Sequence, residues 1–530
     1  MPSALTFPGV YVEEIPSGVR TITGVSTSST AFVDYFARGP MGEAVRITSL
    51  AEFDRIFGGI DPLSEASYAI SQYFLNGGSV AYVVRVAGAT KEDGTAGTVA
   101  ATANKDIVDA AGDVLLKVSA VSAGAWANEA VEIAAVRITG APTDEDAPFN
   151  IFVRELAREN GAVVPGEALL VEAFRGVSMD PKSPNFVVTA LEQSELVRAE
   201  FTAKGTPTTS DGGDTGDPQG PAAWSVVLAG GENGEPPRTA DELLGPSRSE
   251  LRKLDAIAPE VFNLLCLPAA AALGKAAYDP ALAYCIEKRA FLLVDIPESV
   301  DDPAKMRTAL GILPSDNHAA VYFPRLTMPD PANGGRPRNV GASGTMAGIY
   351  ARTDGTRGVW KAPAGTDAVI RGADLATVIT DGDNGGLNPF GINALRNFPI
   401  FGSIVWGART LDGADAKASE WKYVPVRRTA LFIEESLFQA LKWVVFEPND
   451  EPLWAQIRLN VGAFMNDLFR QGAFQGSTPR EAYFVKCDKD TTTQNDINKG
   501  IVNIAVGFAP LKPAEFVVIK LQQMAGQVQV

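Results

Sequence analysis

The chain has 530 residues, which is room for three or four domains at the usual size of about 150 residues each. Lys and Arg number 46 against 63 Asp and Glu, and the resulting formal net charge of −17 disfavours anionic partners such as nucleic acids and lipid surfaces. Hydrophobic residues at 46% and charged residues at 21% are typical of a folded globular protein, so we expect its partners to be proteins.

Residues that commonly bind metals or act as catalytic bases are scarce. The spacings of Cys266, Cys285 and Cys487 fit neither a disulfide framework nor a zinc site. His318 is the single histidine, which excludes mechanisms that need two imidazoles. The sequence opens without a leader pattern, and its longest apolar run is too short to span a bilayer. We therefore expect a cytoplasmic product with no metal, no cofactor and no direct membrane insertion.

In chain order, the first predicted elements belong to an α/β domain that an insertion interrupts. A helix over 62–76 and a strand over 80–86 come before a linker-like segment at 88–104. A second linker-like segment covers 203–221. Alternating or β-branched runs between the linkers predict short strands at 114–118, 131–138, 149–156 and 186–191. The inserted β-rich domain is expected to cover 91–223.

After the insertion, strands and helices alternate along the chain. Strands are predicted at 261–267, 291–296 and 319–326, with helices at 279–290 and 302–312 between them. Such alternation is typical of an α/β layer with a partly parallel sheet. The fold class is therefore predicted as multidomain α/β and α+β, with a central α/β domain split into 25–90 and 224–375.

The last third predicts a C-terminal α+β domain over 376–510 with two long helices. An apolar stripe over 429–446 predicts the first helix, which Pro448 would end. The second helix begins at Asp450 or Glu451, with Pro452 in its first turn, and continues to Gly472.

Both ends of the chain, 1–24 and 511–530, predict extended arms. Each is rich in strand-forming residues and has no nearby hairpin partner, so each must pair elsewhere. The predicted strand residues are Val10, Tyr11, Val12, Glu13 and Glu14 in the first arm and Phe516, Val517, Val518, Ile519 and Leu521 in the second. We expect these arms to add strands to neighbouring chains by β-augmentation.

Several runs together resemble the sheath proteins of contractile phage tails and related injection systems. They are FPGVYVEE at 7–14, GPMGEAVRITSLAEFDRIFGG at 39–59, FLNGGSVAYVVRV at 74–86, LAGGENG at 228–234, GTMAGIYARTDGTRGVWKAPAG at 344–365, LNPFGINALRNFPIFGSIVWGARTL at 387–411, RRTALFIEESL at 427–437 and PAEF at 513–516. Residues 100–225 match least, and Ala127 and Asn128 replace the family's more usual Gly-Asn form.

The resemblance implies a structural subunit and not an enzyme. Such subunits form stacked hexameric rings in a helical sheath around an inner tube protein, and the sheath contracts to drive the tube through a target envelope. Baseplate and terminal cap proteins are further implied partners, and the terminal arms are implied to pair with the C-terminal domains of neighbouring copies. Assembly in the bacterial cytoplasm, into a phage tail or a phage-like injection particle, is also implied. In a type VI secretion system the sheath is usually divided between two polypeptides. Here both FPGVYVEE and PAEF lie on one chain, which favours a phage tail or a phage-like injection system.

The resemblance also suggests a tube-facing surface on the second long helix. Family members attach to the tube through a helix of the C-terminal domain, and this helix has a polar side with Gln456, Asn460 and Asp467. The alternative is an ordinary domain helix whose polar side faces solvent.

A second candidate interface lies in the run ARTDGTRGVW. Arg352, Asp354 and Arg357 alternate in charge and could form a switchable salt bridge between subunits. A local pair that stabilises a loop is the alternative, because the neighbouring glycines suit tight turns. An exposed pair of either kind would contribute only about 0 to 1 kcal/mol.

Two alternative functions stay open: a non-contractile shell or surface-layer protein, and an α/β enzyme with an accessory β-domain. Enzyme motifs are incomplete, since the Gly274-Lys275 pair is followed by Ala276 and not by the Ser or Thr of a phosphate-binding loop. The run DGDNGG at 381–386 resembles the start of a calcium loop, but Ile392 stands where a bidentate Glu is required.

Overall fold

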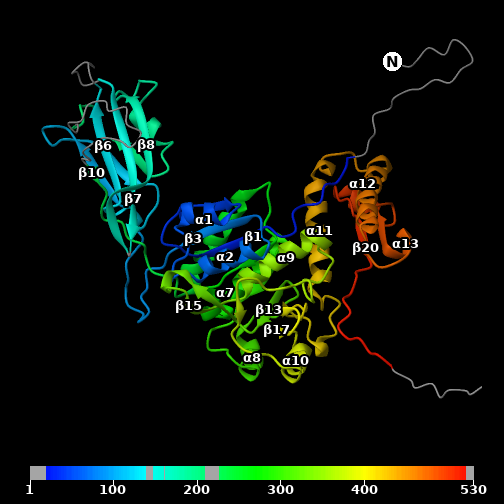
Figure 1. Ribbon diagram of the computed structural model, residues 1–530. Helices are drawn as coiled ribbons and strands as arrows, with labels where there is room; N and C mark the ends of the chain where they lie inside the picture. Colours follow the sequence, from blue (N-terminus) through cyan, green and yellow to red (C-terminus); the bar gives the residue numbers. More distant parts are fainter. Residues whose placement is uncertain (1–19, 139–146, 160, 209–225, 521–530) are drawn as a thin grey trace, which may run out of the picture.

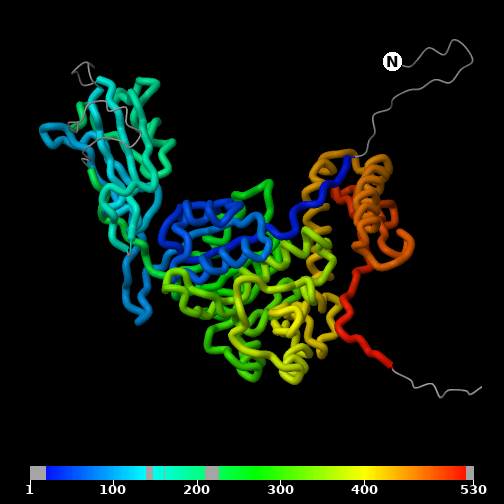
Figure 2. Tube along the Cα trace, viewed as in Figure 1, coloured from blue at the N-terminus to red at the C-terminus, as the bar shows by residue number. Residues whose placement is uncertain are grey.

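The computed structural model describes residues 20–138, 147–159, 161–208 and 226–520, which form three connected parts (Figure 1). The insert lobe, residues 89–234, projects from one side of the central body, residues 27–88 and 235–423. The long helix α11 (Val424–Ala440) joins this body to the C-terminal lobe, residues 441–510. The Cα trace in Figure 2 shows both described chain ends on the side of the C-terminal lobe. None of the helices in the described ranges is long and apolar enough to cross a membrane.

The central body contains an eight-stranded sheet in the order β18-β17-β13-β12-β11-β1-β3-β2. Its strands are β1 (Thr30–Tyr35), β2 (Ala44–Ile47), β3 (Ala81–Val86), β11 (Leu264–Cys266), β12 (Phe291–Val294), β13 (Ala319–Phe323), β17 (Asn393–Phe398) and β18 (Gly402–Val405). All neighbours pair in parallel except β2 and β18, the antiparallel edge strands. The predicted α/β class is confirmed. The sheet extends beyond the boundary expected at residue 375, because β17 pairs in parallel with β13.

Helices cover both faces of this sheet, which explains why strands β1, β3, β12 and β13 are buried along their whole length. One face packs on α1 (Leu50–Phe57), α2 (Glu65–Asn76) and α9 (Ser343–Arg357). The other packs on α4 (Ala240–Leu244), α6 (Ala270–Leu273), α7 (Lys275–Lys288) and α8 (Pro303–Ala309). A small sheet of β14 (Leu326–Asp330), β15 (Arg336–Val340) and β16 (Asp374–Leu375), together with α10 (Asp381–Leu387), completes the central body.

Two glycines let α9 lie directly against the backbone of α2. A Cβ atom on Gly344 would stand 2.2 Å from the carbonyl oxygen of Ala69, and one on Gly348 would stand 2.5 Å from that of Tyr73. Helix α9 continues through the run ARTDGTRGVW as far as Arg357, so the expectation of tight turns there is wrong. Gly355 is an ordinary helical position of α9.

The insert lobe has two antiparallel sheets, in the orders β10-β6-β7-β8 and β4-β5-β9. Their strands are β4 (Asn104–Val108), β5 (Val114–Ala120), β6 (Val131–Arg137), β7 (Phe149–Glu159), β8 (Ala162–Val177), β9 (Val197–Phe201) and β10 (Val226–Val227). The strand predicted over 186–191 is wrong, because Val187–Leu191 forms the short helix α3. Val187 and Leu191 lie one helical turn apart and are both buried, a spacing that also satisfies the hydrophobic pattern.

The two chains that connect the insert lobe to the central body run side by side, since Gly88 and Glu235 form an antiparallel bridge. Arg38 of the central body forms an ion pair of 2.6 Å with Glu155 of the lobe. The buried guanidinium of Arg85 donates to the carbonyl oxygen of Ala123, also in the lobe.

The C-terminal lobe contains α12 (Glu451–Arg470), α13 (Pro479–Ala482), α14 (Gln494–Asn498), β19 (Tyr483–Lys486) and β20 (Ala505–Phe508). The prediction for α12 is confirmed, with Pro452 in its first turn. Helix α11 ends at Ala440 and not at 446, because the chain turns into a short 3₁₀ segment, Lys442–Val444, before it reaches Pro448.

Buried acids occupy the carboxyl end of the parallel strands, where α/β enzymes usually place their ligands. Asp295, which follows β12, accepts hydrogen bonds from the backbone nitrogen and the hydroxyl group of Ser343 at the start of α9, at 2.9 and 2.5 Å. Glu65 accepts from the backbone nitrogen of Gly341 at 2.7 Å and pairs with Arg325. Burial, and then the charge of Glu65, raise the pKa of Asp295 to about 6; burial raises that of Asp34 to about 7.

These raised pKa values predict a pH-dependent stability. Below pH 6 the folded state holds a proton on Asp295 that the unfolded chain, with a pKa near 3.8, still releases, so acidification favours folding through this group. We expect Asp295→Asn, which mimics the neutral acid, to lose this gain, which is about 1 kcal/mol between pH 6 and pH 5 because Asp295 is only half protonated at pH 6. Melting temperatures across pH 5 to 8 would measure it, with the exposed Asp490→Asn as control. A difference in melting temperature between wild type and Asp295→Asn that stays the same from pH 5 to pH 8 would contradict the prediction.

The close contact between α9 and α2 predicts that replacing Gly by Ala has opposite effects on stability at two positions of α9. Gly348→Ala should destabilise the protein by about 1 to 3 kcal/mol, because the new methyl group overpacks against α2. Gly355→Ala should stabilise it by up to about 1 kcal/mol, because Ala favours the helix and its Cβ meets no atom within 4 Å. Melting temperatures of both variants measure the two effects. Equal changes in melting temperature would show that α9 does not pack tightly against α2 at Gly348.

Candidate assembly interface

The sheet of β19 and β20 is a candidate acceptor for strands from another chain. The two strands pair with each other and, among the described residues, with no third strand, so both outer edges keep unpaired backbone groups. Aromatic packing supports the sheet from within the lobe, with Phe474 5.5 Å from Phe508 and 6.3 Å from Tyr483 between ring centroids. A two-stranded sheet is marginal alone, so additional strands would stabilise it.

The C-terminal arm is a candidate donor of such a strand. Phe516, Val517, Val518 and Ile519 are described, have no regular secondary structure and are 75 to 82% exposed. Large apolar side chains rarely stand this exposed in succession unless another surface covers them. Leu521, and Val10 to Glu14 of the N-terminal arm, lie outside the described residues, so strand donation by either arm stays a prediction.

The N-terminal connector, residues 20–27, crosses from the C-terminal lobe to the central body. The backbone nitrogen of Arg20 donates to Oδ1 of Asn460 at 3.1 Å, and its guanidinium lies 4.5 Å from the ring centroid of Trp443. Further along, Val25 donates to the hydroxyl group of Ser436, and the carbonyl oxygen of Thr27 accepts from Arg428. The connector therefore lies along α12 and α11.

This connector changes the predicted polar side of α12. Gln456 and Asp467 are exposed, but Asn460 is 1% exposed because the connector covers it. The tube-facing role of the three residues stays a prediction, and only Gln456 and Asp467 are accessible in the single chain.

The three candidate inter-subunit charges have partners within the chain. Asp354 forms a fully buried ion pair of 2.6 Å with Arg428, each side chain being 3% exposed. Arg352 donates to the carbonyl oxygens of Asn76 and Val369. Arg357 pairs with Asp367 at 3.3 Å on the surface. Of the three, Arg357 is therefore the most accessible to another subunit.

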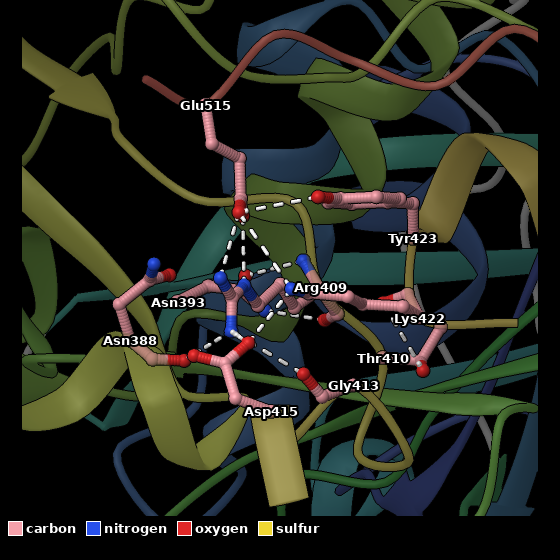
Figure 3. A network of polar contacts seen from close by, with 9 residues as sticks. All are labelled: Asn388, Asn393, Arg409, Thr410, Gly413, Asp415, Lys422, Tyr423 and Glu515. Carbon is pink, nitrogen blue, oxygen red and sulfur yellow. Dashed lines mark hydrogen bonds and ion pairs between the residues drawn. The ribbon is translucent and has the colours of Figure 1, made fainter. Parts of the chain in front are cut away.

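The C-terminal connector, residues 511–515, is held by a polar network that the sequence analysis missed (Figure 3). The guanidinium of Arg409 makes a two-pronged contact with Glu515, from Nε at 2.7 Å and from Nη2 at 2.6 Å. The hydroxyl group of Tyr423 donates to the same carboxylate at 3.2 Å, and burial together with this negative charge raises the pKa of Tyr423. Arg409 and Glu515 both lie in runs that carry the family resemblance, but no local pattern pairs them.

A cleft of about 1100 Å³ opens beside this connector. The rings of Trp360 and Trp406 and the cations Lys361 and Arg396 line it on the central body, and Leu511–Phe516 lines it on the connector side. The described residues include no group of three or more His, Cys, Asp or Glu side chains that could hold a metal ion.

Comparisons with known proteins agree with this arrangement. The profile of the family described as phage tail sheath C-terminal domain matches residues 416–523. A prophage major tail sheath protein of Pseudomonas aeruginosa (strain UCBPP-PA14) is 27% identical over 242 residues, which cover 42% of this chain and 59% of the relative. The tail sheath protein of Vibrio phage KVP40 is 25% identical over 186 residues, which cover 35% of this chain and 26% of the relative. The chain thus spans less than two thirds of either relative.

Solved sheath structures share the fold. The PVC sheath complex of an extracellular contractile injection system, in its contracted state, has a TM-score of 0.57 at 21% identity and covers 98% of both chains. The helical sheath of the anti-feeding prophage, also contracted, has a TM-score of 0.54 at 24% identity and covers 98% of this chain and 100% of that one. The sheath tail protein of Desulfitobacterium hafniense has a TM-score of 0.53 at 14% identity, with 90% and 93% covered. The predicted resemblance is confirmed: the chain has the fold of contractile sheath proteins, and residues 416–523 match the profile of the phage tail sheath C-terminal domain.

Proposed function

We propose that the chain is a structural subunit of a contractile sheath. Copies would form stacked hexameric rings around an inner tube, and contraction of the stack would drive the tube through a target envelope. The observation that carries the proposal is the combination, on one chain, of an open-edged sheet in the C-terminal lobe and an exposed strand-forming arm after Glu515. The structural relatives described above, which are sheaths of contractile injection systems, support it.

Strand donation would join the subunits without fixing their bodies. A strand from Phe516 onward, or from Val10 to Glu14, would pair with a free edge of β19 or β20 in a neighbouring copy. Main-chain hydrogen bonds of this kind persist while the bodies rotate and slide, because the connectors absorb the movement. The free energy of contraction would then be stored at assembly, with no nucleotide required.

The further partners follow from the same proposal. The exposed side of α12 would face the inner tube, and baseplate and cap proteins would bind the two ends of the stack. Assembly would take place in the bacterial cytoplasm, and the product would be a phage tail or a phage-like injection particle. The large negative charge is consistent with protein partners and not with nucleic acid.

The shape of the overexpressed particle tests the proposal. Long hollow helical tubes in negative-stain electron micrographs are the expected outcome. Flat sheets or closed capsids would favour a shell or surface-layer protein, and small discrete oligomers would favour an enzyme. The acids Asp295 and Glu65 at the carboxyl end of the sheet accept hydrogen bonds from the chain itself, which favours the structural proposal over the enzyme.

The N-terminal arm supplies a sharper prediction. Deleting residues 1–18 should leave a folded protein, because the deletion keeps Arg20 and with it the contacts of the connector with α12 and α11. The truncated protein should form no sheaths, because its donor strand is missing. A deletion of residues 2–6, which keeps FPGVYVEE, is the control and should assemble. Tubes of normal length from the longer deletion would contradict the role of the arm.

The insert lobe is predicted to be peripheral to assembly. Gly88 and Glu235 are bridge partners, so a short Gly-Ser link between them can replace residues 89–234 without displacing the central sheet. We expect tubes to form, with a melting temperature lowered by a few degrees, because Arg38 and Arg85 lose contacts across the boundary. A folded monomer that fails to polymerise would mean that the lobe carries an essential contact.

A further inference from the structure

The pair Arg409–Glu515 occupies a distinctive place in the fold. The side chain of Arg409 is 1% exposed, and that of Glu515 is 16% exposed. Glu515 nevertheless belongs to a segment without regular secondary structure, and the next four residues project into solvent. A buried, two-pronged arginine–carboxylate contact therefore lies directly before the exposed residues 516–519 (Figure 3).

The connector before Glu515 is fixed at its other end as well. Pro510 forms a bridge with Phe474, and the carbonyl oxygen of Ala509 accepts a hydrogen bond from Gln475, both within the C-terminal lobe. Residues 511–514 then pass along the cleft to the central body. The chain leaves β20 and runs away from it, and the projecting residues begin on the central body (Figure 1).

We propose that Arg409 and Glu515 form a positioning clamp for the C-terminal strand. The clamp fixes the point at which this strand leaves the molecule, and so sets its register on the neighbouring copy and directs tension from the strand into the central sheet. This inference rests on the proposed sheath function. It deepens that function by giving a role to Arg409 and Glu515, which lie outside the strand that would pair with the neighbouring copy.

Register is the first consequence of the clamp. Side chains alternate between the two faces of a strand, so a slip of one residue would place Val517 and Ile519 on the face meant for Phe516 and Val518. With the clamp closed, the strand starts directly after a fixed residue. With the clamp open, the last fixed position is Pro510, and five more residues would be free to slide or to fold back on β20 of the same chain.

Tension is the second consequence. Without the clamp, a pull on the arm would act on β20, whose sheet has two strands among the described residues. With the clamp, the pull acts on Arg409, whose backbone nitrogen and oxygen are both hydrogen-bonded to the side chain of Asn393 in β17, at 2.6 and 2.7 Å. Strand β17 belongs to the eight-stranded sheet, so the force enters the largest rigid part of the molecule.

The test compares Glu515→Ala with Asp415→Asn. Asp415 is the other acid that contacts Arg409, at 2.9 Å, and its side chain is 51% exposed. It belongs to the central body, so its replacement leaves the Arg409–Glu515 clamp in place. Arg409 keeps Asp415 and the carbonyl oxygens of Asn388 and Gly413 when Glu515 is removed, which protects the fold. Melting temperatures of both variants verify folding.

The first readout is the mobility of the arm in full-length protein that sediments as a monomer. A spin label on Phe516→Cys reports it, because Cys266, Cys285 and Cys487 are buried. We expect the rotational correlation time of the label to fall at least twofold in Glu515→Ala and to stay unchanged in Asp415→Asn. Equal mobility in the two variants would overturn the clamp.

The second readout is the length and helical order of the sheath in electron micrographs. We expect Glu515→Ala tubes to be several-fold shorter than wild-type tubes, with weaker layer lines, and Asp415→Asn tubes to match wild type. A mobile arm in Glu515→Ala with tubes of normal length and order would overturn the positioning role. Wild-type protein that forms no tubes would contradict the proposed function, and with it the register role, whatever the mobility of the label.

Discussion

Buried ion pairs on α11 hold the parts of the molecule in one arrangement. Arg428 meets Asp354 of α9 with both side chains 3% exposed, and Glu435, at 7%, meets Arg289 at 2.6 Å. Removing one partner of such a pair leaves an uncompensated charge and typically costs about 3 to 5 kcal/mol. Sliding of α11 would separate Arg428 from Asp354 in surroundings that exclude water, and would also separate Glu435 from the partly exposed Arg289. The helix is therefore fixed in position as well as stabilised, and the C-terminal lobe with its open-edged sheet is fixed with it.

The same helix also holds the N-terminal connector where it reaches the central body. Arg428 donates a second hydrogen bond to the carbonyl oxygen of Thr27, and Ser436 accepts from Val25. The N-terminal connector is thus held by Asn460 of α12 and then by α11, and the C-terminal arm starts from the buried Arg409. The described part of the C-terminal arm starts at this fixed point on the central body and not on β20, so it has less opportunity to pair with its own acceptor sheet. This geometry favours pairing between identical copies over closure within one copy.

Local sequence patterns predicted the helices and strands that depend on nearby residues. They did not predict contacts between residues that are far apart in the sequence. Helix α12 and strand β3 follow from their apolar periodicity and their boundary residues. Residues 186–191 were misread because Val187 and Leu191 fit a buried helical turn as well as a strand. The burial of Asn460 depends on residues 20–22, which lie more than 400 positions away, and the Arg409–Glu515 clamp joins groups 106 positions apart. Neither contact leaves a periodic pattern in the sequence, although both clamp residues stand in runs that carry the family resemblance.

The acids at the carboxyl end of the parallel strands bind groups of the chain itself. In an enzyme of this fold class, groups at this edge stay open to a ligand. Here Asp295 binds the start of α9, and Glu65 binds both Gly341 and Arg325. The amino-terminal end of α9 is satisfied by protein carboxylates in the place where a bound anion would otherwise lie. The edge thus joins α9 to β12, and α9 carries Asp354 to its partner on α11. The groups that would form a binding site in another protein instead link the central sheet to the helix that positions the C-terminal lobe.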